Sequence, residues 1–151
     1  MKVLLLKTQL GLIPENSATS EWFDKIKPGQ VVRGDFKKVR NYAFHRKFFA
    51  LLNLAYEYWT PGEIDTKWGK PQKHFDTFRK NVTVLAGWGE PVFNIDGTFK
   101  MQPKSISFAS MDNEEFQALY NAVLDVLMKR ILTGMDREEV ERLTERFLEF
   151  A

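Results

Sequence analysis

Residues 41–59 carry the feature that most constrains the fold, an apolar repeat with the spacing of an α-helix. When the segment is projected at about 100° per residue, its large apolar side chains fall on one broad arc. The members of this arc are Phe44, Phe48, Leu51, Leu52, Ala55, Tyr58 and Trp59. Such an arc has to be buried, so the segment predicts a long helix packed against a hydrophobic core.

Three more segments have helical spacing, namely residues 72–86, 113–132 and 137–150. Each of the last two is preceded by an aspartate that is followed three residues later by a glutamate, the pattern of a capping box. These aspartates are Asp112 and Asp136. We therefore expect four long helices, at 41–59, 72–86, 113–132 and 137–150.

Shorter apolar runs predict strands. They are residues 3–7, 105–108, and 91–95 with 98–102, the last two joined by the hairpin signal Asp96-Gly97. Residues 8–16 are rich in turn formers and precede a short helix that ends before Pro28. Residues 31–39 fit either a strand or a loop, because cations interrupt their apolar positions. The layout predicts an α+β fold, with a small antiparallel sheet and segregated helices.

The length of 151 residues fits one domain better than two. We expect a single α+β domain over residues 1–134, followed by a C-terminal amphipathic helix in 135–151 that docks in cis or on a partner chain. The chain contains no cysteine, which excludes a disulfide framework and a thiol nucleophile. It has no apolar run of membrane-spanning length and no cleavable signal pattern, so we expect a cytoplasmic protein.

The net charge of +2 hides an uneven distribution. Residues 1–104 contain 17 Lys and Arg against 10 Asp and Glu, a balance of +7, whereas residues 105–151 contain 5 against 10, a balance of −5. Two stretches, 33–47 and 67–80, are both basic and rich in aromatic residues. Single-stranded nucleic acid is bound by this combination, because cations neutralise phosphates and exposed rings stack on unpaired bases. The alternative is that the rings are core residues and the cations a solvated surface.

Arg46 lies opposite the apolar arc of 41–59, beside the small Ala50, and Arg40 precedes the helix. Because anions are favoured at a helix N-terminus, Arg40, Arg46 and that terminus could bind a phosphate together. A solvated helix flank explains the same residues equally well. The candidate nucleic-acid contacts are Arg40, Arg46, Lys47, Lys37, Lys38 and Lys73, with Trp68 or Trp88 as stacking rings.

We predict no catalytic residue, metal site or cofactor. The two histidines, His45 and His74, have no metal-ligand spacing, and there is no phosphate-binding glycine loop. Asp35, Asp65 and Asp76 lie in the basic part, where carboxylates could hold the metal ion of a nuclease.

Several segments resemble an uncharacterised family of proteins from tailed phages and prophages. The resemblance covers nearly the whole chain and is carried by residues 40–52, 34–35, 78–80, 104–108 and 111–112. This family has no assigned function, so it implies none for the chain.

A shorter segment resembles the phage NinB (Orf) recombination-mediator family. Arg40, a five-residue spacer and the run Arg46-Lys47-Phe48-Phe49-Ala50 fit the form of that family, although its spacer usually ends in Gln-Asn where this chain has Phe44-His45. The resemblance implies binding to single-stranded DNA as a homodimer. It also implies loading of a recombinase onto strands covered by single-strand-binding protein.

The leading hypothesis is therefore a phage-encoded single-stranded-DNA-binding accessory protein of recombination or replication, without catalysis, in the cytoplasm of a bacterial host. Its partners would be single-stranded DNA and a host single-strand-binding protein or recombinase. The last helix has an apolar stripe that could pack on its own domain or on a second copy to form a homodimer. The alternatives are a protein–protein adaptor and a metal-dependent nuclease.

Overall fold

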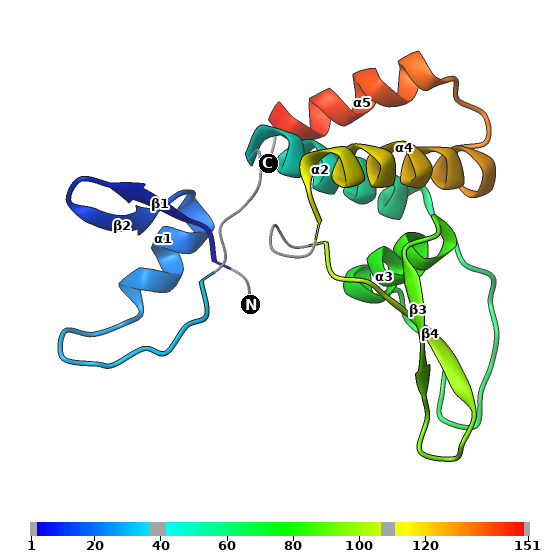
Figure 1. The fold of residues 1–151 in the computed structure, drawn as a ribbon, viewed down its shortest axis with the longest axis horizontal. Coiled ribbons are helices and arrows are strands. Elements are labelled where there is room, and N and C mark those ends of the chain that lie inside the picture. Colours follow the sequence, from blue (N-terminus) through cyan, green and yellow to red (C-terminus); the bar gives the residue numbers. More distant parts are fainter. Residues whose placement is uncertain (1–2, 37–41, 107–110, 150–151) are drawn as a thin grey trace. The chain divides into compact units, whose positions relative to one another are not determined.

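The computed structural model describes residues 3–36, 42–106 and 111–149 (Figure 1). The chain divides into two compact units, residues 1–36 and 37–151, and not into a domain over 1–134 with a separate terminal helix. The reason lies in the core, whose described members run from Phe44 to Phe147 and so include the last helix but no residue of the first unit.

The first unit is a hairpin followed by a short helix. Strands β1 (Leu5–Thr8) and β2 (Gly11–Pro14) pair antiparallel, and helix α1 (Ser17–Asp24) begins after Asn16, whose side chain accepts a hydrogen bond from the Thr19 amide. The stretch that we expected to be a turn thus contains a strand, because the chain reverses within two residues and Gly11 adopts a φ of +140°.

The loop interpretation of residues 31–39 is confirmed for its described part. Residues 31–36 form no strand, and the side chain of Val31 is 98% exposed. Apolar residues form a strand only where a neighbouring strand pairs with their backbone groups. Without that pairing, residues 31–36 form a loop. Residues 37–39 lie outside the described part of the chain.

The second unit contains the four expected helices, α2 (Tyr42–Tyr58), α3 (Phe75–Leu85), α4 (Asn113–Arg130) and α5 (Arg137–Glu149). Helix α5 packs along α2, and α3 packs against both α2 and α4 (Figure 1). Asp112 and Glu115 form the predicted capping box at the start of α4. The helices and the two small antiparallel sheets make the expected α+β fold.

The second unit also contains the expected hairpin, formed by β3 (Gly89–Phe93) and β4 (Phe99–Pro103). The strand expected at 105–108 is absent from its described residues, Ser105 and Ile106. Ile106 packs partly against the core instead. Residues 107 and 108 lie outside the described segments.

The core of the second unit lies between α2 and α4. Phe48, Leu51 and Leu52 of α2 are fully buried, as are Leu119 and Leu124 of α4. Two residues of α2 depart from the helical projection. Tyr58 is 52% exposed although it belongs to the apolar arc, and Ala50 is only 6% exposed although it lies on the opposite side. Ala50 is buried because α5 covers this side of α2.

Helix α5 is an integral part of this core. Val140 and Thr144 are completely buried, and the Thr144 hydroxyl donates to the Val140 carbonyl at 2.7 Å, so its polar group is satisfied. Leu143 and Phe147 of α5 are partly buried and also pack against the core. In this structure α5 packs on α2 of its own chain. Across the described segments, no helix is both long enough and apolar enough to cross a membrane.

Candidate nucleic-acid interface

The two cations predicted at the start of α2 both face α5. The guanidinium of Arg46 donates to the Leu148 carbonyl at 3.4 Å and lies 5.7 Å from the centre of the Tyr42 ring. The ammonium of Lys47 lies 2.7 Å from a carboxylate oxygen of Glu141. Both cations therefore help to hold the terminal helix in place.

Lys47 and Glu141 meet beside a buried tyrosine. The Lys47 ammonium lies 5.3 Å from the centre of the Tyr120 ring, and the Tyr120 hydroxyl donates to Glu141 at 3.4 Å. Burial and, after it, the negative charge of Glu141 raise the pKa of Tyr120 well above its usual value. Tyr120 is therefore a neutral hydrogen-bond donor at physiological pH.

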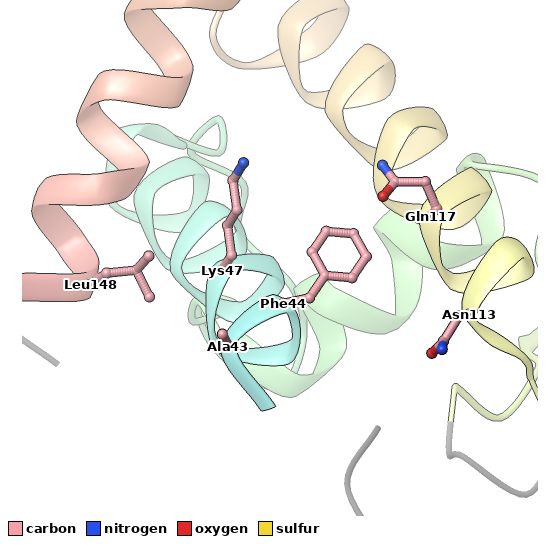
Figure 2. Close-up of a pocket in the computed structure, with 6 residues that line it drawn as sticks. All are labelled: Ala43, Phe44, Lys47, Asn113, Gln117 and Leu148. Atoms are coloured by element: carbon pink, nitrogen blue, oxygen red, sulfur yellow. The ribbon is translucent and has the colours of Figure 1, made fainter. Parts of the chain in front are cut away.

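An open pocket of about 560 Å³ lies where α2 and α4 begin and α5 ends (Figure 2). Its lining is mixed, with the apolar side chains of Ala43, Phe44 and Leu148 beside the polar side chains of Lys47, Asn113 and Gln117. Arg40, Lys37 and Lys38 precede α2 and lie outside the described residues. The expected approach of a ligand beside Ala50 is ruled out, because that residue is buried under α5.

The second basic stretch begins in the loop between α2 and α3 with a tight turn over residues 66–69. Thr66 and Gly69 exchange backbone hydrogen bonds of 3.2 and 3.0 Å, and the Thr66 hydroxyl accepts from the Trp68 amide. Gly69 adopts a φ of +107°, which a residue with a Cβ rarely tolerates. Lys67 and Trp68 occupy the two middle positions of this turn.

Trp68 is held outward by this turn. Its side chain is 84% exposed, and the Lys67 ammonium lies 4.3 Å from the centre of its ring, within cation–π distance. Lys70, which follows the turn, is also exposed. The turn therefore presents a large aromatic ring and two cations to solvent.

Lys73 has a structural partner. Its ammonium donates to the Tyr56 carbonyl at 2.7 Å and lies 4.4 Å from the centre of the Tyr56 ring. A cation at the C-terminal end of α2 compensates the partial negative charge of that helix end. Lys73 thus fixes the loop against α2.

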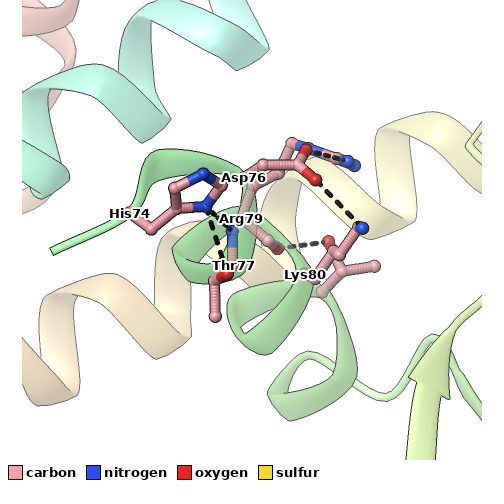
Figure 3. A network of polar contacts seen from close by, with 6 residues as sticks. His74, Asp76, Thr77, Arg79 and Lys80 are labelled. Atoms are coloured by element: carbon pink, nitrogen blue, oxygen red, sulfur yellow. Dashed lines mark hydrogen bonds and ion pairs between the residues drawn. The ribbon is translucent and has the colours of Figure 1, made fainter. Parts of the chain in front are cut away.

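Helix α3 begins with a network of polar contacts (Figure 3). Asp76 binds Arg79 at 2.7 Å and Lys80 at 2.9 Å, and His74 caps the helix by accepting from the Thr77 amide. These hydrogen bonds, first that of Arg79 and then that of Lys80, hold the pKa of Asp76 far below its usual range. Asp76 therefore pairs with two of the cations counted in the basic stretch and neutralises one of their two charges.

The carboxylates considered for a nuclease do not form a metal site among the described residues, where no three His, Asp or Glu side chains gather. Asp76 binds Arg79 and Lys80, and Asp35 belongs to the first unit while Asp65 belongs to the second.

Trp88, the other candidate stacking ring, packs against the core. Its amide donates to the Thr83 carbonyl at 3.1 Å, and its carbonyl accepts from the Lys104 amide at 3.0 Å. Trp88 thus anchors the hairpin to α3. Among the candidates described, Trp68 is the ring that faces solvent.

Comparison with known families shows which family the chain is part of. The family described as "Protein of unknown function (DUF1367)" matches residues 2–68 and 63–150. The chain belongs to this family. The match confirms the resemblance to a family without assigned function. No curated protein and no solved structure matches the chain.

In this DUF1367 protein, sequence reasoning missed one exposed aromatic surface. Phe93, Phe99 and Met101 of the β3–β4 hairpin are 86%, 66% and 47% exposed. The alternation of apolar residues on both sides of Asp96-Gly97 was the available signal. A two-residue turn at Asp96-Gly97 would pair Phe93 with Lys100, whereas the loop has three residues, 95–97, and pairs Phe93 with Phe99 on one face.

Proposed function

We propose that this protein binds single-stranded nucleic acid, most directly single-stranded DNA, through the turn of residues 66–69. The observation that carries the proposal is the 84% exposure of Trp68 beside the ammonium of Lys67. A ring in that position can stack on an unpaired base, and stacking of this kind contributes about 1–3 kcal/mol per base.

The charges around the ring support the same ligand. Lys67 and Lys70 are exposed and flank Trp68, so they are placed to contact phosphates on either side of a stacked base. Lys80 of α3 is 51% exposed and shares its charge with Asp76. Duplex DNA fits the turn less well, because the bases of a duplex are already stacked on one another.

The wider role that we propose is that of a non-catalytic accessory protein of phage recombination or replication in the host cytoplasm. This part rests on the resemblance of Arg40, Arg46 and Lys47 to the NinB form and on the phage and prophage proteins that the chain resembles. In such a role the protein would act beside a host single-strand-binding protein or a recombinase. Arg46 and Lys47 would then contribute mainly by holding α5 against α2.

Fluorescence anisotropy with a labelled oligo-dT strand, titrated at several salt concentrations, tests the proposal. The cations of this site, Lys67, Lys70 and Lys80, can neutralise two or three phosphates, which gives a log–log salt slope of about −1.4 to −2 for single strands. Trp68→Ala should weaken binding by about tenfold, and Lys67→Gln and Lys70→Gln should each reduce the slope by about 0.7.

Two control variants make the comparison specific. Ile64→Ala removes an exposed apolar side chain from the same loop, and Lys129→Gln removes a cation from the end of α4. Both should bind like the wild type. Absence of binding at low salt would refute the proposal, and so would an unchanged affinity in the Trp68→Ala variant.

A further inference from the structure

One face of the β3–β4 hairpin is made only of apolar residues. Cross-strand partners share a face, so Phe93 and Phe99 lie on the same side as Pro91 and Met101. The exposed fractions are 86% for Phe93, 66% for Phe99 and 47% for Met101, and Ile95 within the turn is fully exposed. The outer half of the hairpin therefore carries an uncovered apolar surface, which we call the hairpin face (Pro91, Phe93, Phe99 and Met101, with Ile95 at its end).

The base of the hairpin face is supported by α3. A Cβ placed on Gly89 would lie 3.2 Å from the terminal methyl of Met101 and 3.4 Å from the methyls of Val84, so Met101 extends across Gly89 toward the helix. The hairpin then continues past α3, away from α2, α4 and α5 (Figure 1). A two-stranded hairpin is only marginally stable where nothing packs on it, so its outer half lacks the support that its base has.

The turn that ends the hairpin holds the two phenylalanines in a fixed arrangement. The Asn94 amide donates to the Thr98 carbonyl at 2.7 Å, and the Thr98 amide and hydroxyl donate to the Asp96 carboxylate at 3.0 and 2.6 Å. A surface ordered in advance loses little conformational entropy when it binds.

We propose that the hairpin face binds the same face of a second copy of this chain. The hairpin face contains no charged residue, because Glu90 and Lys100 belong to the alternate positions that point to the other side. Two such faces can therefore meet without burying a charge. Nucleic acid fits this face less well, since it requires cations beside the rings, as at Trp68.

The area of the hairpin face is sufficient for a reversible dimer. An aromatic side chain buries about 150–250 Å², so the exposed parts of Phe93 and Phe99 supply about 300 Å². With Ile95 and Met101 the total is roughly 500 Å² per copy, or about 1,000 Å² for the pair, at the lower limit of specific interfaces. Because each copy contributes the same face, the dimer closes with two-fold symmetry.

The terminal helix does not compete with the hairpin for this role. Val140 is completely buried, and Leu143 and Phe147 pack on the core of their own chain. The apolar stripe that predicted a dimer through α5 is therefore already used in cis.

Sedimentation velocity of the full chain over a wide concentration range tests the proposal. The wild type should show a reversible monomer–dimer equilibrium, and Phe93→Lys or Phe99→Lys should weaken it at least about tenfold, because each places a charge inside the interface. Lys100→Glu changes a residue of β4 that points to the side opposite the hairpin face. Ile64→Lys adds a positive charge at an exposed apolar position in the loop between α2 and α3. Both controls should dimerise like the wild type.

A second measurement uses the absence of native cysteine. Under a mild copper–phenanthroline oxidant, Phe93→Cys should form a covalent dimer and Lys100→Cys should not. Circular dichroism should show that each variant is folded, because the substituted residues are exposed. A wild type that remains monomeric at every concentration would overturn the proposal, and so would a dimer that persists unchanged in both lysine variants of the hairpin face.

Discussion

The ammonium of Lys47 lies 2.7 Å from the carboxylate of Glu141 and joins the start of α2 to α5. Lys47 was a candidate phosphate contact, and the structure gives it a partner within the same chain. The ion pair is about one-third exposed on both sides, so water screens it only in part. It belongs to a contact in which the acidic C-terminal segment covers the basic start of α2.

Replacement of Glu141 by glutamine should have two effects. The free energy of unfolding should fall by about 1 kcal/mol, because the half-buried Lys47 ammonium loses its partner. The pKa of Tyr120 should also fall, because a nearby negative charge is removed, yet it should stay above its usual value because the ring remains buried. Urea unfolding and ultraviolet titration of the tyrosines measure both. Glu138→Gln, at an exposed position of the same helix, is the control and should change neither.

Replacement of Val140 by alanine tests whether α5 belongs to the core. Val140 is completely buried, so the loss of two methyl groups and the cavity left behind should lower the free energy of unfolding by about 2 kcal/mol. Val31→Ala removes the same atoms at a position that is 98% exposed, and its effect should stay within about 0.5 kcal/mol. If Val140→Ala and Val31→Ala lowered the free energy of unfolding equally in chemical denaturation, Val140 of α5 would not be part of the core.

Asp76 should make the stability of the protein depend on pH in the acid range. Its pKa in the folded chain lies below the value of about 3.9 expected for the unfolded chain. The contribution of Asp76 is therefore complete above about pH 3.9 and is lost as the pH falls further, toward the pKa of the folded state. The stability difference between wild type and Asp76→Asn should shrink over that interval. A difference that stays constant in urea titrations down to about pH 2.5 would contradict this account.

The helices of the second unit could be predicted from the sequence because local signals specify them. The apolar arc of 41–59 and the Asp112–Glu115 capping box act within one helix, and α2 and α4 follow them closely. Strand β2 could not be predicted in this way, since Gly11 and Pro14 are turn formers and only pairing with β1 makes the segment a strand.

The candidate site was predictable to a similar extent. Trp68 is exposed because of the local turn at residues 66–69, and the sequence analysis predicted this ring as a candidate for stacking. The partners of Arg46 and Lys47 lie about a hundred residues away in α5, so no local pattern could show that these cations face a helix of the same chain. Burial of Ala50 has the same long-range cause.

Stacking of an unpaired base on Trp68 can be followed directly by the intrinsic tryptophan fluorescence of the full chain, titrated with oligo-dT at low salt. Trp22, Trp59 and Trp88 are partly buried, whereas Trp68 is 84% exposed, so stacking of a base on Trp68 should quench the exposed component. We expect saturable quenching in the wild type, loss of most of that quenching in Trp68→Phe, and reversal by added salt. Quenching of equal size in the wild type and in Trp68→Phe, or no quenching in either, would contradict this expectation.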